Sequence, residues 1–353
     1  MRKLATVQKI TEIKPIDGAD AIELAIVNGW QVVVAKDVNH KVGDDIVYCE
    51  IDSFLPVREE FEFLRRSSFK KMGDDEGFRL KTIKLRGQIS QGLILPISIF
   101  GDFSWTAYEG LDVTERLGIV KYDPPIPAQL AGISKGNFPS FIPKTDEERV
   151  QNLAKDFNKL KEGSYYITEK LDGSSATYYV RDGEFGAASR NLELAEPPAF
   201  VPGTILCEDG VERPKTENTY WKVARELDIK NKLLSLEKNI SIQGELIGEG
   251  IQGNPYKIKG HTLRIFNIFD IDKHEYFDLH DFLITANQLG LETIPVLDTD
   301  FKLPETVEEL LLLAEGKSVL HKDTEREGLV IRSLDRKISF KAISNKFLLK
   351  SKE

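Results

Sequence analysis

Residues 170–173, with the sequence Lys-Leu-Asp-Gly, combine a nucleophile, a carboxylate and a glycine. They lie between two stretches rich in strand-forming residues, 163–169 and 174–180. The amine of Lys170 could attack the α-phosphate of a nucleotide and hold the nucleoside monophosphate as a phosphoramidate. An Asp-Gly turn with a solvated lysine is the alternative. Because such a tetrapeptide occurs by chance in about one in ten chains of this size, other segments must decide.

Two polar residues downstream could face a nucleotide bound at Lys170. Arg190 follows the strand predicted after the lysine loop and could hold a phosphate or the ribose, although a surface arginine at a turn would look the same. Glu245 is the single carboxylate of an apolar stretch, 242–248, that contains two glycines. A charge there is costly unless it is paired or faces a polar site, and glycines let a ligand approach the backbone. An edge strand with Glu245 in water is the alternative.

Three predicted strands complete the set of candidate elements. In the strand 263–271, alternation places Phe269 on one face and Phe266 on the other; one aromatic could stack on a purine, or both could be core. The strands at 327–332 and 337–342 are predicted to form a hairpin. Glu327 begins one strand, and Lys337 and Lys341 lie on the other, an arrangement that suits a triphosphate with its metal. Surface strands joined by salt bridges would show the same pattern.

Composition restricts the class of protein. The chain has 353 residues, of which 41% are hydrophobic and 30% charged, so it is not largely disordered. The length allows two domains. No apolar run is long enough to span a membrane, and the N-terminus has no apolar signal core. Cys49 and Cys207 are the only cysteines and form no CxxC motif, which favours a reducing cytoplasm and argues against a zinc site.

The net charge of −9 opposes bulk attraction to nucleic acid, so a nucleic-acid partner requires a local basic surface. The stretch 65–86 has eight basic residues against three acidic ones. Within it, a predicted strand at 78–83 places Arg79 and Lys81 on one face. A solvated strand face is an equally good explanation.

The sequence divides into two parts with different local patterns. Residues 1–125 contain short strands and a tight hairpin signal at Asn28-Gly29, which predicts a small β-barrel. An OB barrel is the type that commonly binds nucleic acid, and an SH3-like barrel is the rival. A Pro/Gly-rich linker is predicted at 126–144. The remaining domain, 145–353, mixes strands and helices without strict alternation, which favours an α+β fold with antiparallel sheets and flanking helices.

A helix is predicted from a capping box in which Thr145 caps and Glu148 reaches back, and it extends to about Leu160. Arg149 would lie in its first turn. A cation is unfavourable there unless an anionic ligand is close, since helix N-termini and arginines both favour phosphate. Two further helical stretches are predicted, at 219–236 and 306–314.

The second part resembles the superfamily of ATP-dependent RNA ligases, DNA ligases and capping enzymes. The short motifs of their transferase domain occur here in the same order: Lys170-Leu171-Asp172-Gly173, Ser189-Arg190-Asn191, Gly244-Glu245-Leu246, Ile268-Phe269-Asp270-Ile271, Glu327-Gly328-Leu329-Val330 and Ser339-Phe340-Lys341. DNA ligases and capping enzymes carry an OB domain after this point, whereas here a barrel-like domain comes first. That arrangement resembles the Naegleria-type RNA ligases, in which an N-terminal OB domain precedes a minimal nucleotidyltransferase domain.

The resemblance implies three phosphoryl transfers: from ATP to Lys170, from the lysine to an RNA 5′-phosphate, and then attack by a 3′-hydroxyl that seals the strand. It assigns the γ-phosphate to Arg149 and the α-phosphate to Lys341, and we expect Phe269 to stack on the adenine. Since an ammonium group is no nucleophile, Lys170 would need a lowered pKa. Arg190 is expected on the ribose side.

The same resemblance implies Mg²⁺ or Mn²⁺, held through water by Asp172, Glu245 and Glu327. Many RNA ligases have two lysines spaced K-x-K in the last motif, but Ile343 follows Lys341 here, so Lys337 is the candidate substitute. The expected partner is nicked or broken RNA, bridged by RNA or DNA, and the expected state is a cytoplasmic monomer. The alternatives are a DNA nick ligase, a GTP-using capping enzyme or an inactive RNA-binding protein.

Overall fold

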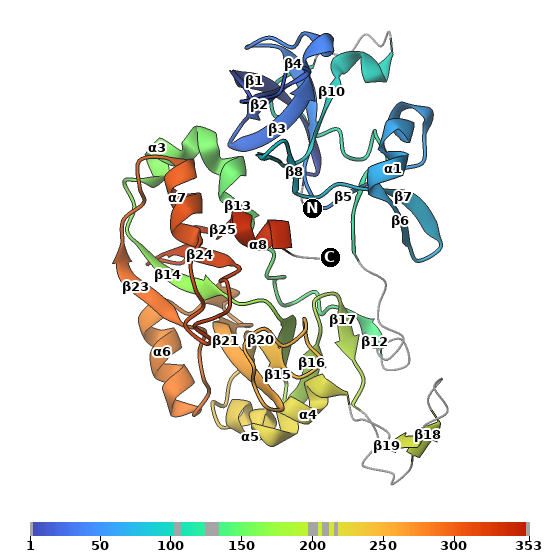
Figure 1. Ribbon diagram of the computed structural model, residues 1–353. Coiled ribbons are helices and arrows are strands. Elements are labelled where there is room, and N and C mark those ends of the chain that lie inside the picture. Colours follow the sequence, from blue (N-terminus) through green and yellow to red (C-terminus); the bar gives the residue numbers. More distant parts are fainter. Residues whose placement is uncertain are drawn as a thin grey trace.

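The computed structural model describes residues 3–101, 107–123, 134–196, 204–206, 212–214 and 218–350. Figure 1 shows two parts, with the N-terminal domain above the larger C-terminal domain and the last helix between them. Cys207 and residues 126–133 of the predicted linker lie outside the described residues. No helix among the described residues has the length and apolar character needed to cross a membrane.

The N-terminal domain contains a five-stranded antiparallel sheet in the order β10-β4-β1-β2-β3. A second sheet, β11-β5-β7-β6, and the hairpin β8-β9 complete it. The strands are β1 (Ala5–Pro15), β2 (Ile22–Val27), β3 (Trp30–Ala35), β4 (Asp45–Cys49), β5 (Ser53–Pro56), β6 (Phe69–Met72), β7 (Asp75–Arg79), β8 (Ile83–Leu85), β9 (Gln88–Ser90), β10 (Leu93–Pro96) and β11 (Val120–Lys121). The helical turns are η1 (Lys36–Val38), η2 (Glu59–Leu64), α1 (Arg65–Ser68) and η3 (Ile97–Phe100).

The tight hairpin predicted at Asn28-Gly29 is confirmed, since it joins β2 to β3 with Val27 opposite Trp30. Asn28 has a φ of 55°, a left-handed conformation that asparagine tolerates well. The strand predicted at 78–83 is broken between β7 and β8. The basic stretch is therefore spread over α1, β6, β7 and β8 and does not form one continuous face.

The C-terminal domain is built on two sheets, as predicted for an α+β fold. One is antiparallel with the order β12-β17-β16-β15-β20-β21-β22, and the other has the order β13-β25-β24-β14-β23. Their strands are β12 (Ser134–Asn137), β13 (Glu148–Arg149), β14 (Tyr165–Lys170), β15 (Ser174–Arg181), β16 (Glu184–Ala188), β17 (Leu192–Leu194), β20 (Ile240–Gly248), β21 (His261–Asp270), β22 (Glu275–Tyr276), β23 (Val296–Phe301), β24 (Gly328–Ser333) and β25 (Ser339–Ile343). A separate pair comprises β18 (Thr204–Leu206) and β19 (Glu212–Pro214).

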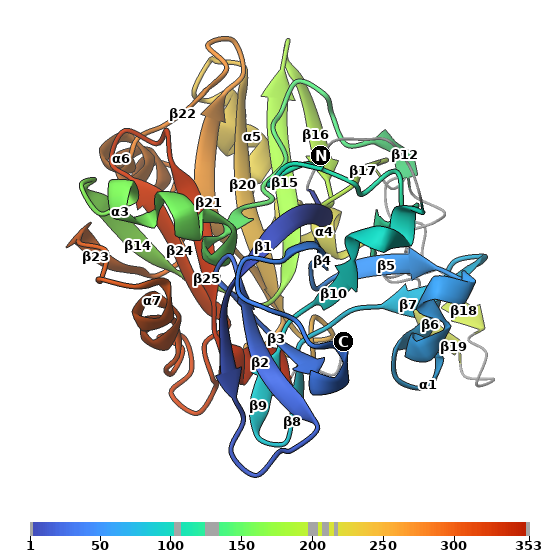
Figure 2. The same ribbon diagram turned by 90° about the horizontal axis from the view of Figure 1, so that it is seen from above.

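Helices cover the outer faces of these sheets (Figure 2). Those of the seven-stranded sheet bury Trp221 and Phe282 in one core, and those of the five-stranded sheet bury Phe157 and Leu310 in another. The helices are η4 (Val150–Asp156), α3 (Phe157–Leu160), α4 (Thr219–Glu226), α5 (Ile229–Leu234), α6 (Leu279–Gln288), α7 (Val307–Ala314) and α8 (Asn345–Lys350). The predicted helix at 219–236 is two helices, because Asp228 takes a left-handed φ of 51° between them.

Two predicted boundaries are wrong. The helix expected from Thr145 starts only at Val150, as a 3-10 helix, because Glu148 and Arg149 form the short strand β13 beside β25. The capping box is therefore absent. The C-terminal end of the predicted linker is regular structure, since β12 pairs with β17 and extends the seven-stranded sheet.

The two domains make specific polar contacts. Trp30 donates its indole N–H to Asn152 Oδ1 at 2.6 Å, and the Gly29 N–H donates to the carbonyl of Gln151 at 3.1 Å. A Cβ on Gly29 would lie 2.9 Å from the Cα of Gln151, so only glycine permits this approach. The N-terminal barrel thus holds the segment that leads from β13 into η4.

Candidate active site

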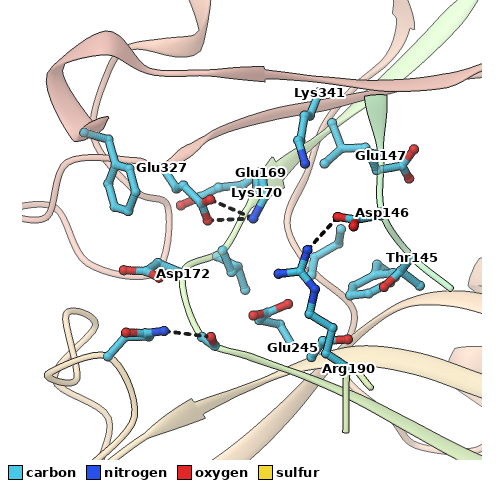
Figure 3. A pocket seen from close by; sticks show the side chains of 18 of the residues that line it. Thr145, Asp146, Glu147, Glu169, Lys170, Asp172, Arg190, Glu245, Glu327 and Lys341 are labelled. Atoms are coloured by element: carbon cyan, nitrogen blue, oxygen red, sulfur yellow. Dashed lines mark hydrogen bonds and ion pairs between the residues drawn. The ribbon is translucent and has the colours of Figure 1, made fainter. Parts of the chain in front are cut away.

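A pocket of about 1030 Å³, open space at its mouth included, lies between the two sheets of the C-terminal domain (Figure 3). The lining residues come from strands of both sheets, from the loops that join them and from α8: Thr145, Asp146, Glu147, Glu169, Lys170, Leu171, Asp172, Gly173, Ser175, Arg190, Glu245, Gln252, Phe266, Ile294, Glu327, Val330, Arg332, Lys341 and Phe347. The structure therefore brings together six predicted site residues: Lys170, Asp172, Arg190, Glu245, Glu327 and Lys341.

Lys170 is the last residue of β14, and its Nζ lies 2.7 Å from Glu327 Oε1 and 2.8 Å from Glu327 Oε2 (Figure 3). The contact follows from strand register, because Lys170 is opposite Gly328, the residue after Glu327. Two elements 157 residues apart in the sequence thus fix the amine in place. This lysine is not a solvated turn residue.

The electrostatics of the free site hold Lys170 in its protonated form. Burial by itself would lower the pKa of Lys170, but the charges of Glu327 and Glu245 outweigh it and raise that pKa above its usual value. For the carboxyl group of Glu245 burial acts in the opposite direction and raises the pKa to about 8, although the positive charge of Lys170 opposes this. The lowered lysine pKa expected from the sequence is therefore not a property of the free protein; bound charges would have to supply it.

The loop after Lys170 is held by a residue that sequence reasoning missed. The backbone N–H of Asp172 donates to the hydroxyl of Tyr256 at 2.6 Å. A Cβ on Gly173 would overlap the carbonyl oxygen of Leu246, which explains the glycine of the motif. Tyr256 lies in the loop between β20 and β21, and nothing in that loop's pattern signals its role.

Arg190 lies in the pocket as predicted, and its Nη2 pairs with Asp146 Oδ1 at 2.7 Å. The other oxygen of Asp146 pairs with Nζ of Lys121 at 2.8 Å, a residue of β11 in the N-terminal domain. Burial would raise the pKa of Asp146, but the two cations outweigh it and hold that pKa well below its usual range. Two ion pairs therefore connect Lys121 of the barrel, through Asp146, to Arg190 in the pocket. Asp146 was missed because it was expected to lie inside a helix.

The aromatic residue of β21 that lines the pocket is Phe266, and the prediction of Phe269 is wrong. A β-bulge in β21 between the partners of Gln243 and Gly244 inserts one extra residue. Phe266 and Phe269 therefore lie on the same face of the strand. Phe269 is only 1% exposed and packs against Tyr276, beyond the pocket. The guanidinium of Arg332, which also lines the pocket, lies 5.9 Å from the centre of the Phe266 ring.

Arg149 does not line the pocket, which corrects its assignment to a phosphate. Its side chain is 8% exposed and points to the N-terminal domain, where Nη2 pairs with Asp52 Oδ2 at 3.1 Å. The guanidinium also lies 5.9 Å from the centre of the Trp30 ring. Without the expected helix, Arg149 sits on β13 and serves the domain interface.

We expect Arg149 and Asp52 to be coupled in stability. Arg149→Met removes the nearer of two arginines from the half-buried Asp52, and Asp52→Asn leaves the buried guanidinium of Arg149 without its negative charge. Each change alone should therefore destabilise the protein by about 1–3 kcal/mol. The double variant should lose less than the sum by about 1 kcal/mol. Denaturant unfolding of the four proteins measures this. Additive losses of unfolding free energy, together with a raised KM for ATP in the Arg149 variant alone, would contradict the coupling. They would instead support the original prediction that Arg149 binds the nucleotide.

The second lysine site is also corrected. Lys341 projects from β25 into the pocket (Figure 3). Lys337 lies before β25, in the turn that follows β24, where its side chain is 81% exposed and pairs with Asp335 at 3.2 Å. It is absent from the pocket lining and cannot replace the missing lysine of a K-x-K pair.

The three predicted metal carboxylates, Asp172, Glu245 and Glu327, line the same pocket. Within the described ranges, no group of three or more His, Cys, Asp or Glu side chains is close enough to ligate one ion directly. The donors are all carboxylate oxygens, which suit Mg²⁺ or Mn²⁺. This spacing still allows the three carboxylates to contact a divalent cation through water molecules, which is the arrangement expected from the sequence.

A barrel followed by a two-sheet domain, with a lysine, carboxylates, an arginine and a second lysine in one cleft, defines a covalent nucleotidyltransferase of the polynucleotide ligase class. Comparison with protein families agrees: an OB-fold domain family matches residues 4–97, and the RNA ligase family matches residues 163–352, more than half of the chain. The chain belongs to the RNA ligase family. The OB match also decides against the SH3-like barrel.

Solved structures give the same result. The chain is similar to the apo form of a Naegleria gruberi RNA ligase mutant, with 41% identity, a TM-score of 0.88, and 100% of this chain and 99% of that one covered. It is also similar to mutants of that ligase with AMP and Mn (42%, TM-score 0.88, 99% and 99%) and with ATP and Mn (42%, TM-score 0.87, 99% and 99%). The search of curated proteins gave no match. The N-terminal OB domain fused to a ligase domain makes this a Naegleria-type RNA ligase.

Proposed function

We propose that this RNA ligase joins a 3′-hydroxyl to a 5′-phosphate at breaks in RNA, with ATP as the energy source, and that it acts in RNA repair. The observation that carries the proposal is the placement of Lys170 in a pocket with Glu327, Glu245 and Lys341. The Naegleria gruberi ligase with ATP or AMP and Mn supports the choice of nucleotide and metal. A monomeric state and a cytoplasmic location stay predictions from the sequence.

The residues of the pocket suggest how ATP is held. Phe266 takes the role first given to Phe269. It packs in the apolar cluster that contains Ile294 and shares the pocket with Val330, which suits an adenine. Arg190 suits the ribose or a phosphate, and Lys341 suits the α-phosphate.

The reaction proceeds in three balanced transfers. Lys170 loses a proton, its Nζ forms a bond to the α-phosphorus, and the bond to the pyrophosphate breaks. The AMP then moves from the lysine to the RNA 5′-phosphate, which restores the amine. The 3′-hydroxyl finally loses its proton and attacks the phosphorus of the RNA 5′-phosphate. This attack forms the phosphodiester and releases AMP.

A divalent cation fits the donor set of the pocket, because its carboxylates supply oxygen atoms only. Asp172, Glu245 and Glu327 would hold Mg²⁺ or Mn²⁺ through water. The ion would supply positive charge at the phosphates, and this charge would disfavour the protonated form of Lys170.

Sealing assays test the proposal. The protein is incubated with ATP, a divalent cation and 5′-labelled nicked duplexes in which the strand to be sealed is RNA or DNA and the bridging strand is RNA or DNA. We expect sealing of RNA 3′-hydroxyl ends, with RNA-adenylate visible at early times. Sealing of all-DNA nicks at an equal rate would favour a DNA nick ligase. Lysine labelling without sealing of any nick would contradict an end-joining function.

A further inference from the structure

The C-terminal helix α8 lies between the OB domain and the ligase domain (Figure 1). Lys346 pairs with Glu315 at 2.7 Å, which ties the helix to the ligase domain. On the other side, Leu348 packs against the core cluster of the OB domain that contains Trp30 and Tyr48. A six-residue helix has little stability of its own, so these contacts set its position.

Between these two anchors, α8 places Phe347 in the lining of the pocket. The helix begins next to the catalytic lysine's partner, because the N–H of Ser344 donates to the carbonyl of Glu327 at 2.8 Å. Phe347 is half-buried and is the second aromatic residue of the pocket lining. Phe266 belongs instead to the apolar cluster that contains Leu171 and Ile294. With Phe266 assigned to the adenine, Phe347 is the aromatic side chain of the pocket lining that is left for a second ligand.

A basic hairpin of the OB domain adjoins the start of α8. The side-chain amide of Gln91 donates both to Thr82 and to Asn345, each at 3.3 Å, and so joins the two ends of the β8-β9 hairpin to the helix. Three basic side chains are exposed here: Lys81, two residues before β8, and Lys84 and Arg86 of the hairpin. None of the three forms an ion pair with a residue in the part of the chain that the structure describes.

We propose that Phe347 and this hairpin form the surface that receives the broken RNA strand. Phe347 stacks on a base of the terminal nucleotide at the pocket mouth, and Lys81, Lys84 and Arg86 contact the phosphates of the strand that leads away from it. An aromatic platform beside unpaired cations is the combination that holds single nucleic-acid strands. The inference rests on the proposed function, and it assigns the RNA contact to residues outside the ATP site.

The stacking part is tested with Phe347→Leu, which keeps an apolar side chain but removes the aromatic face, and Phe347→Trp, which keeps the face. Both should form lysyl-AMP from labelled ATP like the wild type. With the nicked RNA duplex, Phe347→Leu should bind and seal at least about tenfold more weakly, and Phe347→Trp should be close to wild type. Equal sealing by Phe347→Leu and wild type would overturn the stacking role, and so would loss of lysyl-AMP in Phe347→Leu.

The phosphate part is tested with the double variant Lys84→Ala/Arg86→Ala against the matched control Lys230→Ala/Lys238→Ala, whose exposed lysines lie at α5 and just after it. Binding of the nicked RNA is measured at several salt concentrations. The hairpin variant should show a salt slope smaller by about 2, while the control keeps the wild-type slope. Equal slopes for both variants would overturn the contact. A wild-type protein that forms no lysyl-AMP would instead refute the proposed function itself.

Discussion

Replacing Lys341 by alanine is expected to abolish formation of lysyl-AMP. The side chain enters the pocket from β25, in register with Val330 of β24, which also lines the pocket. β25 contains no second lysine, and Lys337 lies in the exposed turn before the strand. Loss of a cation that stabilises developing phosphate charge typically costs a factor of about 10²–10³ or more. Single-turnover labelling with α-labelled ATP measures the loss.

Lys337→Ala provides the matched control for this result. The sequence made Lys337 the candidate substitute for the second lysine, but replacing an 81% exposed side chain that pairs with Asp335 should have no effect on adenylylation. A wild-type rate in Lys341→Ala would remove Lys341 from the site. A marked loss in Lys337→Ala would mean that the turn enters the pocket when ATP binds.

Replacing Glu327 by glutamine should produce the second large effect, with two opposite consequences that can be measured separately. The charge of Glu327 opposes burial and raises the pKa of Lys170, so its removal should lower that pKa in the free protein. The amine should then react with an acylating reagent at lower pH than in the wild type, as read by mass spectrometry of its peptide. Lysyl-AMP formation should nevertheless fall by about 10²-fold or more, because the carboxylate also orients the amine and would hold the cation.

Glu327→Asp separates the effect of the negative charge from the effect of side-chain length, because aspartate keeps the carboxylate on a shorter side chain. It should keep a raised pKa at Lys170 but hold the amine less well, and so show an intermediate rate. Wild-type labelling by Glu327→Gln would show that the 2.7 Å pair is unimportant for catalysis. An unchanged acylation profile in Glu327→Gln would show that its charge does not set the lysine pKa.

Much of this site could be predicted because it depends on local patterns. Lys170 lies at a strand end before an Asp-Gly turn, Glu245 is the single carboxylate of an apolar strand, and Lys341 alternates with apolar residues of its strand. These local features made the three residues candidates, and all three line one pocket. The Asn28-Gly29 hairpin and the α+β class followed from turn chemistry and element order in the same way.

The errors arose where tertiary contacts override local patterns. The bulge in β21 put Phe266 and Phe269 on one face, and no sequence signal marks that extra residue. Arg149 lies on a two-residue strand held by β25 and by the OB domain, so a good capping signal produced no helix there. Tyr256 and Asp146 act through partners distant in sequence, which one chain alone does not reveal.

Covalent labelling tests the central claim, that Lys170 carries AMP. Wild-type protein and Lys170→Met are incubated with α-labelled ATP or GTP and Mg²⁺ or Mn²⁺, denatured and separated by electrophoresis. We predict label on the wild-type protein with ATP, little with GTP, and none on Lys170→Met. Absence of label with either nucleotide, or equal label on Lys170→Met, would contradict the account.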